Sequence, residues 1–229
     1  MKISFADVAK ADIVAFIVDE GDGLPTTAAG LDKASGGLLT EALTGVRFDG
    51  KKDQQALIVL PKGGESRRAV LIGGGKAKKR DARILESIGA NLVKSQAKSG
   101  FKSLALHVGS AEDAARVALG AQLAAYRFDS YFTKMKPDQK PSLTSVTLVV
   151  DDAKAAKAAF VPLEAAGEGT NLARDLVNMP PNDLYPASFA AKLKDLSEFG
   201  VEVEILGEAA MKKLGMNALL GVGQGSRKE

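Results

Sequence analysis

The sequence contains no cysteine and no tryptophan, and it has a single histidine, His107. Without cysteine there can be no disulfide framework, no thiolate nucleophile and no zinc ribbon, which fits a reducing compartment. No apolar run approaches the roughly 20 residues that span a bilayer. The first residues, MKISFADVAKAD, also lack the apolar core of a signal peptide. We therefore expect a cytoplasmic protein without a membrane partner.

The composition is that of an ordinary soluble protein. Of the 229 residues, 45% are hydrophobic and 26% are charged, which supplies ample apolar material for a core and excludes a disordered chain. The net charge of +3 is too small to predict a polyanion partner by itself, so such a partner would need a local cluster of cations. The length fits one large domain, or one domain and part of a second.

Short apolar runs bounded by glycine, proline and charged residues predict buried strands. These runs cover residues 13–18, 56–60, 69–72, 104–108 and 146–150. Longer segments between them have apolar residues at steps of three and four, as in 81–99, which is typical of helices. Strands that alternate with helices indicate an α/β domain with a mostly parallel or mixed sheet.

Two helix starts carry capping residues. Ser110 is followed three residues later by Asp113, close to a capping box, so a long helix is expected directly after Ser110. Asp151 and Asp152 precede an alanine-rich passage and predict the start of another helix. Pro162 removes a backbone donor inside that passage, and we expect it to divide the helix into two pieces.

The region after this passage is expected to contain further helices and strands. Pro180 and Pro181 force an extended break, and we favour a rigid corner at 178–181 over a recognition loop. Gly200 suits the left-handed position that ends a helix, and VEVEIL after it alternates valine or isoleucine with glutamate, which is typical of a strand. We expect helices at 170–177 and 187–199, and strands at 201–206 and 218–222.

The alanine-rich passage marks the predicted domain boundary. We expect an N-terminal α/β domain at 1–150, a helical linker at 151–177 and the start of a second domain at 178–229. No repeat and no low-complexity tail is visible in the sequence.

His107 ends an apolar strand and could in principle act as a base. No serine motif and no cysteine is present for it to activate. We interpret it as a packed or rim histidine.

The glycines at 73–75, followed by Lys76, lie between a predicted strand and a predicted helix, where backbone amides can cradle a phosphate. The Walker pattern fails because no serine or threonine follows Lys76, and the dinucleotide pattern fails because position 78 is a lysine. We favour a plain turn, with a nucleotide-like ligand as the alternative.

Several charged residues lie close together in the sequence. The densest basic cluster could contact the phosphates of DNA, although a solvated helix face is the simpler interpretation. Asp151 with Asp152 and Glu202 with Glu204 resemble paired carboxylates, but their contexts favour helix capping and solvation. The basic cluster consists of Lys76, Lys78, Lys79, Arg80 and Arg83.

Three segments resemble the leucyl aminopeptidases, also called cytosol aminopeptidases. They are AYRFDSYFTK at 125–134, TNLARDLVNMPPNDLYP at 170–186 and GMNALLGVGQGSRKE at 215–229. The resemblance runs from about residue 117 to about residue 227. Tyr185 departs from the family pattern, which usually has a hydroxyl residue there to cap the next helix.

The resemblance implies a three-layer α/β/α N-terminal domain of the macro-domain type with a mixed sheet. A linker helix and the first elements of a catalytic α/β domain follow it. Residues 171–186 would then be architectural, packing the linker helix against the catalytic domain.

Family members are two-metal hydrolases that release N-terminal amino acids from peptides and assemble as homo-hexamers. Their two divalent cations, manganese or zinc, polarise the scissile carbonyl and activate a bridging water. The ligands lie on motifs of the type K-G-x-T-F-D-S-G-G and N-T-D-A-E-G-R, and neither occurs in this sequence. We therefore expect no catalytic, cofactor-binding or metal residue here, and no activity without the missing catalytic domain.

Two other functions stay open at this point. The N-terminal domain could be a module that binds DNA or a nucleotide-like ligand, since some bacterial members of the family bind DNA through this domain. The chain could also be an inactive assembly partner of full-length subunits.

Overall fold

The computed structural model describes residues 1–45, 47–61 and 63–228. The chain forms two compact units, Met1–Asn171 and Leu172–Glu229. The first unit is a mixed α/β fold built on one sheet, which confirms the predicted fold class.

The sheet of the first unit has six strands in the order β1-β6-β5-β2-β4-β3. Neighbouring strands are parallel except β3, which runs antiparallel to β4. All five predicted strands are confirmed, and β1 is an additional strand that the apolar runs did not indicate. Its bounds and those of the others are Lys2–Ala6 for β1, Ile13–Asp19 for β2, Gln55–Val59 for β3, Arg68–Gly75 for β4, Ser103–His107 for β5 and Ser145–Val149 for β6.

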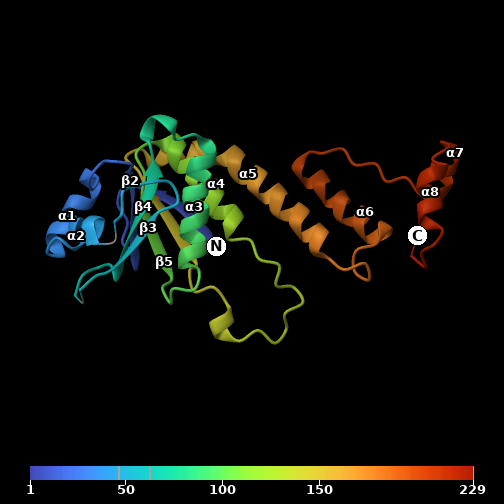
Figure 1. Ribbon diagram of the computed structural model, residues 1–229. Coiled ribbons are helices and arrows are strands. Elements are labelled where there is room, and N and C mark those ends of the chain that lie inside the picture. Colours follow the sequence, from blue (N-terminus) through green and yellow to red (C-terminus); the bar gives the residue numbers. More distant parts are fainter. Residues whose placement is uncertain (46, 62, 229) are drawn as a thin grey trace. The chain divides into compact units, whose positions relative to one another are not determined.

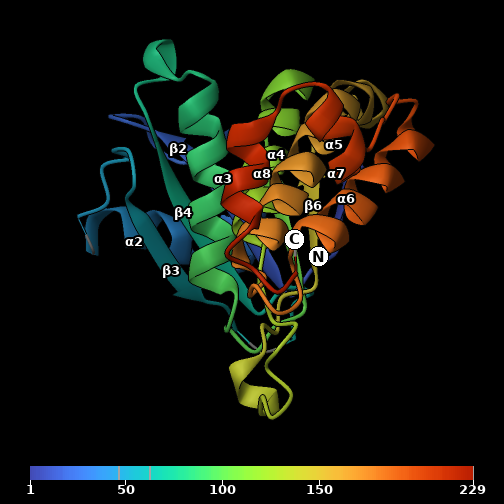
Figure 2. The same cartoon turned by 90° about the vertical axis from the view of Figure 1, so that its right-hand side faces the viewer.

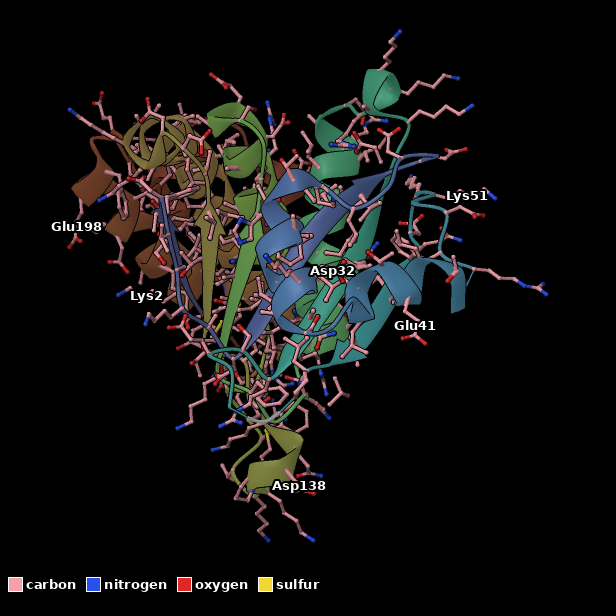
Figure 3. All side chains as sticks on the ribbon, turned by 90° about the vertical axis from the view of Figure 1, so that its left-hand side faces the viewer. Lys2, Asp32, Glu41, Lys51, Asp138 and Glu198 are labelled. Atoms are coloured by element: carbon pink, nitrogen blue, oxygen red, sulfur yellow. The ribbon has the colours of Figure 1, made fainter. Side chains whose placement is uncertain are left out.

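Helices cover the two faces of the sheet and give the unit three layers (Figure 1). One core lies under α3 (Ala82–Gln96), α4 (Ala111–Ala124) and the first part of α5 (Ala153–Asn178). A second core lies under α1 (Ala29–Ala34) and α2 (Leu38–Gly45) on the other face. Figure 3 looks at this second face, with Asp32 labelled in α1.

The predicted caps form as hydrogen bonds. The Ser110 hydroxyl accepts from the backbone amide of Asp113 at 3.1 Å, at the start of α4. The carboxylate of Asp152 accepts from the amide of Ala155 at 2.8 Å, at the start of α5. Both interactions satisfy amides that a helix start would otherwise leave without a partner.

The predicted interruption at Pro162 is wrong, because α5 continues unbroken through it. Proline removes one backbone hydrogen bond and costs about 3 kcal/mol in a helix interior. Packing of the same helix offsets this cost: Ala156 and Phe160 are buried, and the Phe160 ring lies 5.5 Å from that of Phe5. Pro162 itself is exposed.

Besides the end of α5, the described residues of the second unit contain only short helices. The predicted break after residue 178 and the left-handed Gly200, with φ of 81°, are confirmed. The helix after Tyr185 starts without a side-chain cap from that residue; instead the Ser188 hydroxyl accepts from the Tyr185 amide at 2.9 Å. The helices are α6 (Pro186–Lys194), a 3-10 turn η4 (Asp195–Phe199), α7 (Glu208–Lys213) and α8 (Asn217–Gly223).

Both predicted strands of this second unit are wrong. Residues 201–206 have no regular secondary structure, and 218–222 lie inside α8. An alternating segment becomes a strand only when another strand pairs with it, and the described part of this unit supplies none. The short apolar run of 218–222 is compatible with a helix as well as a strand.

None of the described helices combines the length and the apolar character that crossing a bilayer requires.

Candidate functional site

The glycine turn at the end of β4 is closed by backbone hydrogen bonds. The Gly73 amide donates to the carbonyl of Gln54 at 2.9 Å, and the Gly75 amide donates to the carbonyl of Gly50 at 3.0 Å. A Cβ atom at Gly73 would overlap the Lys51 carbonyl, so only glycine fits against this neighbouring loop. Two of the three glycine amides are thus already used inside the protein. This geometry favours the plain turn over a phosphate cradle.

The basic cluster divides into two parts. Lys76, Lys78, Lys79 and Arg83 are exposed, as expected for a solvated face. Arg80 instead turns inward: its guanidinium forms an ion pair with Asp19 at the end of β2, and its Nε donates to the carbonyl of Gly74 at 3.2 Å. Its side chain is only 15% exposed. The arrangement gives Arg80 a structural role and leaves four cations in contact with solvent.

This division predicts unequal effects of two alanine substitutions. Arg80→Ala should lower the free energy of unfolding by about 2 kcal/mol, because it leaves the Asp19 carboxylate and the Gly74 carbonyl without their partner. Lys78→Ala should change it by less than about 0.5 kcal/mol. Urea titrations followed by circular dichroism measure both. Equal losses in the two variants would show that Arg80 is as solvated as its neighbours.

His107 lies at the end of β5 and packs against an aromatic ring. Its imidazole stacks on Phe16 of β2, with ring centroids 4.8 Å apart and planes inclined by 17°. Burial lowers the pKa of His107 below its usual value, so the ring is neutral at pH 7. These contacts agree with the interpretation of a packed histidine.

The paired carboxylates are not brought into a metal-binding arrangement. Asp152 caps α5, whereas Glu202 and Glu204 are exposed in the segment that forms no strand. Within residues 1–45, 47–61 and 63–228, no group of three or more His, Cys, Asp or Glu side chains is placed to hold a metal ion.

Two hollows lie beside Arg127, and the first of them is at the amino ends of β1 and β6. The first has a volume of about 530 Å³, with an apolar wall that includes Val93 and Leu143, and with Lys2 and Lys94 at its border. The second, of about 490 Å³, is lined in part by Tyr131 of the AYRFDSYFTK segment. Arg127 borders both hollows, and its Nε donates to the Asp129 carboxylate at 2.7 Å. The sequence did not predict these hollows, and only the resemblance of AYRFDSYFTK to the family had singled out this region.

Comparison of the sequence with family models gives two consecutive matches. The model described as "Cytosol aminopeptidase family, N-terminal domain" matches residues 13–135. The model described as "Cytosol aminopeptidase family, catalytic domain" matches residues 171–229.

Curated relatives carry the same name. The chain is 44% identical over 217 residues to a probable cytosol aminopeptidase of Caulobacter vibrioides, with 94% of this chain and 44% of that protein aligned. It is 45% identical over 206 residues to a probable cytosol aminopeptidase of Rhizobium etli, with 87% of this chain and 42% of that protein aligned. The chain therefore spans less than half the length of these relatives.

Solved structures share the fold. A tomato leucine aminopeptidase mutant superposes with a TM-score of 0.79 at 22% identity, over 94% of this chain and 46% of the other. The bottromycin maturation enzyme BotP in complex with Mn superposes with a TM-score of 0.70 at 27% identity, over 95% of this chain and 43% of the other.

Proposed function

The chain belongs to the cytosol aminopeptidase family, and from this premise we propose that it supplies the N-terminal portion of a two-metal aminopeptidase. The complete enzyme would release N-terminal amino acids from peptides in the cytoplasm and would assemble as a homo-hexamer. The 229 residues would not hydrolyse peptides alone.

One observation carries this proposal: the two family models match one after the other, in the order N-terminal domain and catalytic domain. The second match begins at residue 171, where the chain also divides into its two compact units. We assign residues 1–150 to the N-terminal domain, 151–177 to the helical linker and 178–229 to the start of the catalytic domain.

The second unit has the surface expected of a domain start that needs further chain to cover it. None of the described residues 172–228 is buried. Large apolar side chains are exposed instead, among them Phe199 (79%), Val201 (50%), Ile205 (48%), Leu214 (65%), Leu219 (55%) and Val222 (81%). A segment without buried side chains gains too little from apolar burial to offset its loss of chain entropy. We propose that the remainder of the catalytic domain covers these side chains.

Limited proteolysis tests this assignment. We expect cleavage within 184–222 well before cleavage within 1–150, because local opening is easiest where no side chain is buried. Mass spectrometry of the fragments locates the cuts over time. A longer chain that carries the remaining catalytic domain serves as the control, and protection of 184–222 should rise in it. Equal protection of both segments in the 229-residue chain would count against the assignment.

The complete enzyme would hold two divalent cations, manganese or zinc. Support comes from family membership and from BotP, whose structure was solved in complex with Mn. The cations would polarise the scissile carbonyl and activate a water molecule. The described residues of this chain offer no cluster of ligands for them, so we assign no step of hydrolysis to these residues.

A further inference from the structure

The outer edge of β3 presents backbone groups that no other strand within residues 1–45, 47–61 and 63–228 satisfies. β3 is the last strand of the sheet and pairs only with β4 (Figure 2). The Leu60 amide donates to the Arg67 carbonyl at 3.1 Å, and the Gly73 amide donates to the Gln54 carbonyl at 2.9 Å. Even-numbered residues of this strand therefore face β4. The amides and carbonyls of the odd-numbered residues 55, 57 and 59 point away from the sheet.

The same three residues also expose their side chains. Ala56 and Ile58 are buried, whereas Leu57 is 51% and Val59 is 71% exposed, and Gln55 is exposed as well. The strand QALIV contains no charged residue and no proline, and its pairing with β4 has no bulge. Charges, prolines and bulges are the usual means by which proteins prevent pairing at a sheet edge. β3 has none of them.

We propose that β3 pairs antiparallel with β3 of a second copy of this chain, across a two-fold axis at Leu57. In this register Leu57 faces Leu57 of the second copy, and Gln55 faces Val59 of the second copy. Each facing pair exchanges two backbone hydrogen bonds, so every outward amide and carbonyl of the three residues finds a partner. The two sheets become one continuous sheet.

The strand fits its own copy for two reasons. In a two-fold contact the same surface patch of each copy contacts that patch of the other copy, so the patch must be complementary to itself. Here the opposed side chains are Leu with Leu and Gln with Val, so no like charges meet. Because five residues pair on each side, the contact is small, and we expect a reversible dimer that forms at high protein concentration.

The first test is sedimentation equilibrium of the 229-residue chain over a range of concentrations. Leu57→Lys places two ammonium groups opposite each other and should weaken dimerisation on the order of tenfold or more. Val8→Lys is the matched control, because Val8 is 83% exposed and lies outside the strands. It should leave dimerisation unchanged. Circular dichroism verifies that both variants fold. If the Leu57→Lys variant dimerises as strongly as the unchanged chain, the contact lies on another surface, such as the exposed apolar side chains of the second unit, and the proposal is overturned.

The second test reads the pairing residue by residue through amide exchange in nuclear magnetic resonance spectra. In dilute protein the amides of Ala56 and Ile58 should be protected and those of Gln55, Leu57 and Val59 should exchange rapidly. In concentrated protein all five should be protected. Leu57→Lys should restore rapid exchange at residues 55 and 59. If the odd-numbered amides stay unprotected at concentrations where dimers form, the contact lies elsewhere and the proposal fails.

Discussion

Gly120→Ala is expected to lower the free energy of unfolding of the first unit by about 3 kcal/mol or more. Gly120 lies in α4 at the point where this helix contacts α3, and the two helices lie side by side (Figure 2). A Cβ atom at Gly120 would overlap the backbone carbonyl of Glu86 in α3. The reciprocal position is also a glycine, since a Cβ atom at Gly89 of α3 would overlap the carbonyl of Val117 in α4.

The large effect follows from what the added methyl group meets. A flexible side chain can turn away at little cost, but a helix backbone can only move as a whole. The helices would have to separate and give up part of the core beneath them, where Leu85, Ile88 and Ala118 are almost fully buried. Overpacking of this kind outweighs the better helix propensity of alanine.

Gly30→Ala in α1 is the matched control for this prediction. A Cβ atom there meets nothing within 4 Å, so alanine should raise stability by about 0.5–1 kcal/mol through its lower entropy in the unfolded chain. Urea titration with circular dichroism gives both values. The two substitutions should therefore differ in sign. If Gly120→Ala were as harmless as Gly30→Ala, the close approach of α3 and α4 would be wrong.

The sequence predicted those parts of the first unit that depend on local pattern. The apolar runs located β2, β4, β5 and β6 because buried parallel strands are apolar on both faces. They located the antiparallel β3 as well, because its exposed side chains Leu57 and Val59 are also apolar. β1 escaped this criterion because KISFA is a short edge strand in which only Ile3 and Phe5 face the main core. The caps at Ser110 and Asp152 were predictable because a cap needs only residues three positions apart.

Contacts between distant segments were not predictable in the same way. Gly89 and Gly120 look like weak helix formers in the sequence, and only the crossing of α3 and α4 explains them. The glycines at 73–75 resemble a phosphate loop in the sequence, but in the structure the amides of Gly73 and Gly75 donate hydrogen bonds to the carbonyls of Gln54 and Gly50. Pro162 predicts a helix divided into two pieces, but the packing of Phe160 sustains one continuous helix. In each case long-range packing overrides the local pattern.

The strands predicted at 201–206 and 218–222 failed for a related reason. A segment with a strand-like pattern forms a strand only when a second strand pairs with it, and residues 172–228 contain no strand. The segments 125–134, 170–186 and 215–229 predicted membership of the cytosol aminopeptidase family, and the matches to the two family models confirm it.

The largest difference in activity is expected between the 229-residue chain, which we propose hydrolyses no peptide, and a chain with the complete catalytic domain. Two-metal catalysis needs carboxylate ligands that hold both cations beside the substrate. Losing an entire catalytic centre removes an acceleration on the order of 10⁶-fold or more, which reduces turnover to the background of the assay. The described residues hold no cluster that could replace such a centre.

The most direct measurement is the hydrolysis of leucine p-nitroanilide by the purified 229-residue chain with added manganese or zinc. The matched control is a longer chain that continues into the K-G-x-T-F-D-S-G-G and N-T-D-A-E-G-R motifs, and a mock purification measures contaminating peptidase. We expect turnover by the longer chain and none above the mock preparation by the 229-residue chain. Metal-dependent hydrolysis that co-elutes with the 229-residue chain and exceeds that of the mock preparation would contradict the proposal that this chain is inactive alone.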